Sequence, residues 1–233
     1  MRTAVLGRSR IVPSPYRFSL PVFNRLMAIV GLAAGLAAGS VVVGAAAAPA
    51  TIVVLGDSLA AGFGLRDEGE AFPARLEAAL MARGRAVRVI NAGVSGDTTA
   101  GGRSRLDWAL ADRPDLVIVE LGGNDGLRGI DPAVTLANLD DVLARLKAQG
   151  VRALLAGMLA PPNLGRAYGD AFNAVFPRLA ERHGVAFYPF FLDGVAAERA
   201  LNQPDGIHPN PAGVAVIVAR ILPAVEAALD RRD

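Results

Sequence analysis

The sequence TIVVLGDSL, residues 51–59, decides the fold. Five β-branched or apolar residues lead without a break into Gly56, Asp57 and Ser58, which predicts a buried strand that ends in a tight turn. Four further runs of this kind follow, at residues 87–91, 116–121, 153–156 and 185–188. Continuous apolar runs of this length are typical of parallel strands that are covered on both faces.

Helical patterns separate these runs. Asp131 followed by Pro132 is typical of a helix start, and Asn210 followed by Pro211 repeats the pattern. Apolar residues at helical spacing follow both starts, namely Leu139, Val142, Leu143 and Leu146, and then Val214, Ile217, Val218, Ile221, Leu222 and Val225. Pro223 lies inside the second pattern, which predicts a bend or a break there. The alternation predicts a three-layer α/β/α domain around a five-stranded parallel sheet.

Composition narrows the class of protein. The 233 residues include no cysteine and two histidines, so a disulfide framework and a cysteine zinc site are excluded and a histidine-rich metal centre has few ligands. Five arginines and no acidic residue lie in residues 1–50, which leaves 19 basic and 22 acidic residues, a net charge of −3, in the rest of the chain. A mildly acidic body without a basic stripe argues against nucleic acid as a partner.

Residues 1–50 have the pattern of an export signal. Residues 26–48 are apolar or small and follow the five arginines, and small residues at 45–48 suit cleavage near residues 47–50. We predict a signal peptide or an N-terminal membrane anchor over residues 1–50 and one domain over residues 51–233. Both the basic region and the apolar run are longer than usual for a signal peptide, so an uncleaved anchor in the inner membrane is the alternative. In either case the body is exported to the periplasm or secreted, and any membrane association involves only this segment.

Ser58 is a candidate nucleophile because it follows a buried strand. In open parallel sheets, ligands bind beyond the carboxyl ends of the strands. A serine hydroxyl there can attack a substrate if a base stands beside it. The alternative is a serine that only caps a helix.

His208 is the candidate base. Asp205 lies three residues before it in a loop bounded by glycine and proline, so the carboxylate can reach Nδ1 and leave Nε2 free to take the serine proton. The alternatives are a surface-loop histidine and a turn-forming aspartate. His183, in the last turn of a predicted helix, is the competing base.

Two other strand ends offer hydrogen-bond donors for an oxyanion. Gly96 can turn its backbone N–H toward a ligand without a Cβ atom in the way, and Asn124 can add a side-chain amide. Glycine and asparagine also form ordinary turns. Each of these strand ends carries a different group that acyl transfer needs. This combination favours one acyl-transfer site over ordinary turns as the explanation.

Four blocks resemble, in order, those of the SGNH (GDSL) hydrolase family: GDSL at 56–59, SGD at 95–97, GGND at 122–125 and DGIHP at 205–209. The likeness extends over residues 51–230. It implies a flavodoxin-like sheet, no metal or organic cofactor, and hydrolysis of carboxylic esters and thioesters through an acyl-enzyme. Arylesterase, lysophospholipase and acyl-thioesterase activities are the ones it implies.

The resemblance also assigns roles. It makes Ser58 the nucleophile, His208 the general base and Asp205 its orienting partner. The oxyanion hole would consist of the Ser58 and Gly96 backbone N–H groups and the Asn124 amide. Substrate contacts fall on Gly96, Asn124, Leu127, Arg128 and Pro162. Residues 62–65 and 159–166 would set the acyl pocket, and Glu120, an acid inside a buried-looking strand, would support nearby loop amides.

Two other functions fit parts of the sequence. A carbohydrate O-acetylesterase of the same family would need a short, polar acyl pocket. A flavin- or phosphate-binding module would need anion donors after the first strand, where Asp57 instead places a carboxylate. An inactive scaffold is disfavoured because every required group is present. The expected partner is a small-molecule acyl ester or a lysophospholipid, bound by a monomer or weak oligomer.

Overall fold

The computed structural model describes residues 48–231. The signal peptide or anchor predicted over residues 1–50 therefore lies, but for its last three residues, outside the described part. The described chain has one parallel sheet of five strands, β1 (Ala50–Gly56), β2 (Val87–Gly93), β3 (Leu116–Glu120), β4 (Arg152–Ala156) and β5 (Ala186–Tyr188). All five predicted strands are confirmed, and no boundary shifts by more than two residues.

The strand order, β2-β1-β3-β4-β5, places the chain's reversal point between β1 and β3. The carboxyl ends of the strands are in register, because Gly56 pairs with Gly93 on one side and with Glu120 on the other. Glu120 in turn pairs with Ala156. The loops that follow the strands therefore meet at one edge of the sheet, at the reversal point where open α/β sheets bind ligands.

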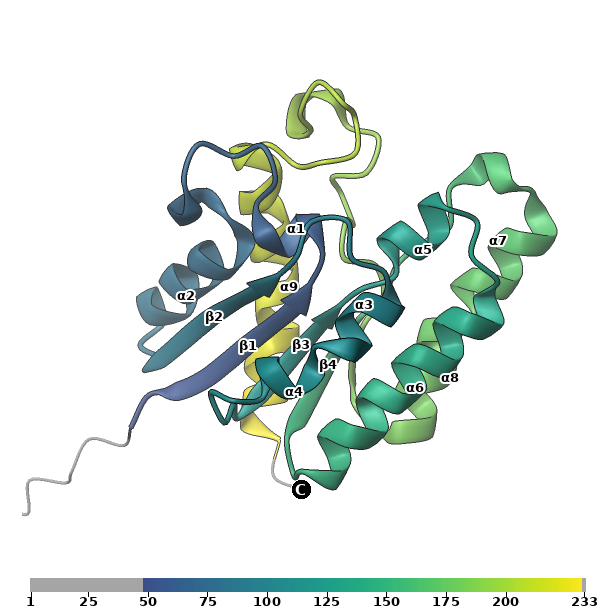
Figure 1. Ribbon diagram of the computed structural model, residues 1–233. Coiled ribbons are helices and arrows are strands. Elements are labelled where there is room, and N and C mark those ends of the chain that lie inside the picture. The colour runs from purple at the N-terminus through teal and green to yellow at the C-terminus, as the bar shows by residue number, and fades with distance from the viewer. Residues whose placement is uncertain (1–47, 232–233) are drawn as a thin grey trace, which may run out of the picture. The chain divides into compact units, whose positions relative to one another are not determined.

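Helices cover both faces of the sheet (Figure 1). They are α1 (Ser58–Ala61), α2 (Phe72–Ala82), α3 (Thr99–Ser104), α4 (Leu106–Ala109), α5 (Gly123–Leu127), α6 (Pro132–Ala148), α7 (Arg166–Asn173), α8 (Val175–His183) and α9 (Pro211–Asp230), with 3₁₀ turns η1 (Glu68–Glu70), η2 (Pro162–Leu164) and η3 (Arg199–Leu201). Helices α2 and α9 pack together on one face, and α4, α6 and α8 cover the other. This arrangement confirms the predicted three-layer α/β/α architecture.

The two predicted helix starts are also confirmed. The Asp131 side chain accepts the backbone N–H of Ala133 at the start of α6, and the Asn210 side chain accepts the N–H groups of Ala212 and Gly213 at the start of α9. Both predicted apolar stripes are buried. Of the helices in residues 48–231, only α9 is long and apolar enough to cross a membrane, but its stripe packs against the sheet and α2.

Of the bend or break predicted at Pro223, the break does not occur, because α9 runs without interruption from Pro211 to Asp230. Pro223 cannot donate a hydrogen bond to the carbonyl of Ala219, one turn earlier. Both residues are exposed, so water can satisfy that carbonyl. The buried stripe on the opposite side of α9 holds the helix in place.

Replacing Pro223 should therefore stabilise the protein. In Pro223→Ala the missing helical hydrogen bond is restored on an exposed face, and we expect the free energy of unfolding to rise by about 1–3 kcal/mol. The matched control is Pro211→Ala, at the first helical position where proline is favourable, which should bring no gain. Urea unfolding of the two variants and the wild type measures both effects, and an equal change in both would contradict this account.

Candidate active site

Ser58 lies at the turn between β1 and α1, where the chain is tightly packed. At Gly56 a Cβ atom would lie 2.4 Å from the Glu120 carboxyl and 2.5 Å from the Ala60 Cβ, so only glycine fits. Asp57 then caps α1, and its carboxylate accepts the Leu59 N–H at 3.0 Å. Ser58 is consequently the first residue of α1, at the edge where the other strand-end loops meet.

The structure brings Ser58, His208 and Asp205 into one hydrogen-bonded row. The Ser58 Oγ lies 2.9 Å from His208 Nε2, and His208 Nδ1 lies 2.7 Å from Asp205 Oδ2. Asp205 Oδ1 also accepts the backbone N–H groups of Ile207 and His208, each at 3.0 Å. The bond from the His208 backbone is the main cause that lowers the pKa of Asp205 to about 2, so its carboxylate is ionised across the neutral range.

Gln203 and Phe63 hold the His208 loop in place. Gln203 Nε2 donates to the carbonyls of Phe63 (2.7 Å) and Pro209 (3.0 Å), and the Gln203 backbone N–H donates to the His208 carbonyl (2.7 Å). The Phe63 ring packs against the His208 imidazole, with 4.6 Å between centroids. These contacts fix the imidazole toward Ser58. Sequence reasoning missed Gln203, which carries no motif of its own.

Three possible donors lie in the segments that follow β1, β2 and β3, namely the backbone N–H groups of Ser58 and Gly96 and the side-chain amide of Asn124. Among the hydrogen bonds of residues 48–231, none uses the backbone N–H of Ser58 or of Gly96. Gly96 has a φ of +84°, a conformation that side chains disfavour, and its carbonyl accepts a hydrogen bond from Arg128 Nη2 at 2.8 Å. Asn124 Nδ2 donates one of its two N–H groups to Asp57 Oδ2 at 3.0 Å. The second N–H of that nitrogen stays available to a ligand.

Arg105 ties the Gly96 loop to the ends of β1 and β2. Its guanidinium pairs with Asp97 Oδ2 at 2.6 Å and donates to the carbonyls of Ala92 (2.5 Å) and Gly56 (2.7 Å). Three acceptors from three chain segments match the planar fork of arginine, which lysine could not reproduce. Arg105 therefore positions the Gly96 loop beside Ser58, a role that sequence reasoning missed.

A buried polar network connects the loop that carries Gly96 with the loop that carries Asn124. Asp125 accepts the Thr99 N–H at 2.8 Å, the Thr99 hydroxyl at 2.5 Å and the Thr135 hydroxyl at 3.1 Å. Asn138 donates to the Thr99 hydroxyl at 3.1 Å. All these side chains are buried and partnered, so the network fixes the relative position of α3, α5 and α6.

Two buried carboxyl groups lie under Ser58. Asp57 is 1% exposed, and burial raises its pKa to about 6. Glu120 is fully buried, and burial raises its pKa well above its usual value, with the nearby Asp57 charge as the next cause. Glu120 Oε2 accepts the Asp57 backbone N–H at 3.2 Å, which agrees with the predicted support of a loop amide, whereas Oε1 has no partner among the described residues.

A largely apolar cavity of about 420 Å³ opens beside Ser58 and His208. Its apolar wall comes from five segments and includes Leu127, Met158, Leu159, Phe190, Leu192 and Ile207. Of the residues predicted to contact substrate, Asn124, Leu127 and Pro162 line this cavity, and Gly96 and Arg128 do not.

The prediction that residues 62–65 help to form this pocket is wrong, since none of them lines it. Gly64 and Leu65 line a separate hollow with Arg66 and Glu70. Phe63 instead covers the His208 ring.

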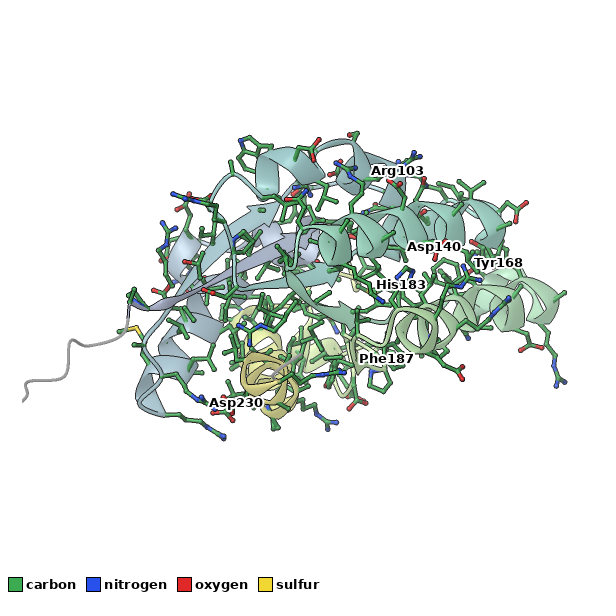
Figure 2. All side chains as sticks on the ribbon, turned by 90° about the horizontal axis from the view of Figure 1, so that it is seen from below. Arg103, Asp140, Tyr168, His183, Phe187 and Asp230 are labelled. Carbon is green, nitrogen blue, oxygen red and sulfur yellow. The ribbon has the colours of Figure 1, made fainter. Side chains whose placement is uncertain are left out.

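His183, the competing base, belongs to a different part of the molecule. Its Nε2 lies 2.7 Å from Asp140 Oδ1, and Figure 2 shows the two side chains together between α6 and α8. His183 lines another cavity, with Gly150 and Val151 before β4, at the opposite ends of the strands. Within residues 48–231, no group of three or more acidic or histidine side chains is arranged to hold a metal ion.

Comparison with known proteins identifies the family. Residues 54–216 match the sequence model of the GDSL-like lipase/acylhydrolase family. The chain belongs to this family. It is 42% identical over 181 residues to esterase TesA from Pseudomonas aeruginosa, which covers 77% of this chain and 90% of the relative.

Two further members are similarly close. The chain is 42% identical over 166 residues to thioesterase 1/protease 1/lysophospholipase L1 from Escherichia coli strain K12, which covers 71% of this chain and 78% of the relative. The crystal structure of AlinE4, an SGNH-hydrolase family esterase, matches with a TM-score of 0.67 at 46% identity, over 80% of this chain and 100% of that one. The protein is thus an enzyme that hydrolyses carboxylic esters and thioesters of small molecules, and the predicted family and enzyme class are confirmed.

The raised pKa of Asp57 predicts a pH-dependent stability. Because its pKa is about 6 in the folded protein and 3.8 in the unfolded chain, the folded state binds this proton more tightly. The stability that Asp57 contributes is therefore fully present below pH 4 and is lost as the pH rises through 6. Relative to Asp57→Asn, which does not titrate, the wild-type free energy of unfolding should fall by about 2–3 kcal/mol between pH 4 and pH 7. Urea unfolding at a series of pH values measures this difference, and a constant difference would contradict the raised pKa.

Proposed function

We propose that Ser58, His208 and Asp205 are the catalytic triad of this hydrolase, with Ser58 as the nucleophile. The observation that carries the proposal is the row of contacts from Ser58 Oγ to His208 Nε2, 2.9 Å, and from His208 Nδ1 to Asp205 Oδ2, 2.7 Å. An ionised Asp205 holds the Nδ1–H tautomer of the imidazole, so the Nε2 lone pair faces the serine hydroxyl.

The reaction proceeds in two halves. Ser58 Oγ attacks the carbonyl carbon while His208 Nε2 takes its proton, and the carbonyl oxygen becomes an oxyanion. His208 then gives the proton to the leaving alkoxide or thiolate, and the acyl group remains on Ser58. In the second half His208 deprotonates a water molecule, which attacks the acyl carbon. The carboxylic acid leaves, and Ser58 regains its proton.

The oxyanion is stabilised by the three donors beside Ser58. These are the backbone N–H groups of Ser58 and Gly96 and the second N–H of the Asn124 amide. The proposal is supported by their lack of other partners among the described residues and by the position of Asn124 at the cavity wall. Such donors act on charge that develops only in the transition state, so they raise the rate without tightening substrate binding.

The substrates we propose are esters and thioesters with acyl chains longer than acetyl, lysophospholipids among them. The apolar wall of the cavity, from Leu127 to Ile207, suits a hydrocarbon chain that leads away from Ser58. An O-acetylesterase would gain little from this wall, because an acetyl group reaches no farther than the atoms next to the carbonyl.

Activity on a series of p-nitrophenyl esters from acetate to palmitate tests this function. We expect the highest kcat/KM beyond acetate, and loss of hydrolysis by more than about 10³-fold in Ser58→Ala and in His208→Ala, because each loses a member of the triad. The chain offers a matched control for each variant. Ser104→Ala and His183→Ala remove the same groups away from the cavity and should retain the wild-type rate.

Each other outcome has a definite meaning. Near-native activity of a folded Ser58→Ala would exclude Ser58 as the nucleophile, and loss of activity in His183→Ala would reopen the choice of base. Hydrolysis restricted to acetate would favour the carbohydrate O-acetylesterase.

We also propose that the enzyme is exported, to the periplasm or beyond, and meets lysophospholipids or exogenous esters there. The support is the sequence pattern of residues 1–50, in which five arginines precede an uncharged apolar run. Cell fractionation with immunodetection should find the protein outside the cytosol. A cytosolic enzyme would contradict the export and the substrate location together.

A further inference from the structure

The two buried carboxyl groups under Ser58 have no part in the proposed triad or among its oxyanion donors. Asp57 contacts both the turn that carries Ser58 and the loop that carries Asn124. Its side chain accepts one hydrogen bond on each oxygen, from the Leu59 N–H on Oδ1 and from Asn124 Nδ2 on Oδ2, both at 3.0 Å. The two donors belong to α1 and α5, which follow different strands.

The bond to Asn124 selects one of two orientations of its amide. An amide can be turned over so that its oxygen and nitrogen exchange places, at little cost when nothing around it discriminates. A carboxylate accepts hydrogen bonds and donates none, so it attracts the NH₂ group and repels the carbonyl oxygen. With Nδ2 held by Asp57, the second N–H of Asn124 can face the cavity that Asn124 lines with Ser58 and His208.

We infer that Asp57 is a positioning residue that keeps the Asn124 amide with its N–H group toward the oxyanion. In the opposite orientation the Asn124 carbonyl oxygen would face both the Asp57 carboxylate and the developing negative charge. Asp57 thus excludes an orientation that would replace an oxyanion donor with a repulsive lone pair. This inference rests on the proposed role of Asn124 in the oxyanion hole.

Asp57 is ionised at the pH where the enzyme is assayed, although its surroundings raise its pKa. Burial raises the pKa of Asp57 to about 6, while the bonds from Leu59 and Asn124 and the nearby His208 oppose that rise. Asp97, in the loop after β2, acts in the same direction as burial, but it is paired with Arg105. Glu120, on β3, is fully buried, and burial raises its pKa well above its usual value, which favours its neutral form beside Asp57. At pH 8 Asp57 is a carboxylate and can only accept.

The isosteric variant Asp57→Asn tests the inference at pH 8. The two donors bind different oxygens of Asp57, and in asparagine one of these positions is an NH₂ group that cannot accept. If the oxygen stays on Leu59, its NH₂ group faces Asn124 and turns that amide over. We expect kcat to fall by about 10²–10³-fold, as for the loss of one oxyanion donor, with KM changed less than about threefold.

A double-mutant cycle with Asn124→Ala separates positioning from a structural role. Asn124→Ala alone should lower kcat by a similar factor of about 10²–10³. In the Asn124→Ala background, Asp57→Asn should lower kcat by less than about threefold further, because the group that Asp57 positions is gone. If the two losses multiply, or if Asp57→Asn alone keeps its kcat, the inference is overturned.

Two further variants keep the test decisive. Asp57→Ser retains a side chain that can cap the Leu59 N–H but gives Asn124 no charged acceptor, so it should lose kcat in the same way if Asp57→Asn does not fold. Asp67→Asn, an exposed aspartate at the start of η1 without a capping hydrogen bond, should keep the wild-type kcat.

The failure of this inference can be told from the failure of the proposed function. An active Ser58→Ala would overturn the triad itself. An inactive Ser58→Ala together with a fully active Asp57→Asn would overturn only the positioning role of Asp57.

Discussion

The close packing of Gly56 against Glu120 is the constraint on which the site depends. These residues end two neighbouring strands and pair with each other, with no room for a Cβ atom between the backbone and the carboxyl. The chain can therefore turn sharply after β1 and begin α1 at Ser58. A bulkier residue at position 56 would push the turn away from β3, and with it the serine that must meet His208 on a loop from the other end of the chain.

The same packing explains why a glutamic acid can be buried at that point. Glu120 Oε2 accepts the backbone N–H of Asp57, so the carboxyl supports the turn that covers it. An ionised Glu120 would place a second negative charge beside Asp57 and close to a developing oxyanion, where low dielectric makes repulsion strong. Burial raises the pKa of Glu120 well above its usual value and so favours its neutral form, while both Asp57 oxygens accept hydrogen bonds from N–H donors.

Much of the fold could be predicted because its signals are local. The five strands are short apolar runs, and the starts of α6 and α9 carry their capping residues and prolines in sequence. Ser58 could be predicted for a related reason, since it directly follows a strand and strand ends converge in any parallel sheet. Asp205 and His208 lie beyond η3, and they were predicted from their three-residue spacing and from the family resemblance. The helix is not broken at Pro223, and periodicity alone could not show this, because it does not reveal that the lost hydrogen bond lies on the exposed side of a well-packed helix.

The positioning residues could not be predicted, because their partners are far away in the sequence. Arg105 binds carbonyls of Gly56 and Ala92, and Asp57 binds Asn124, 67 residues later. No spacing rule connects such positions before the strand order is known. Residues 62–65 were predicted to form part of the acyl pocket because they are close to Ser58 in the sequence. Closeness in sequence does not reveal on which side of α1 the chain continues, and these residues do not line the cavity.

The two aspartates beside the serine and the histidine show how environment divides one residue type into two roles. Asp205 is partly exposed and held by N–H donors from its own loop, which lowers its pKa to about 2 and keeps its charge fixed over the working range of the enzyme. Asp57 is buried, and burial raises its pKa to about 6 although the Leu59 and Asn124 donors oppose that rise. A residue that only capped α1 would not need to be a buried carboxylate, since serine or asparagine caps as well. The free-energy cost of burying this carboxylate is explained if its charge has a role that a neutral cap cannot fill. Such a role is to accept a hydrogen bond from the Asn124 amide without ever donating one.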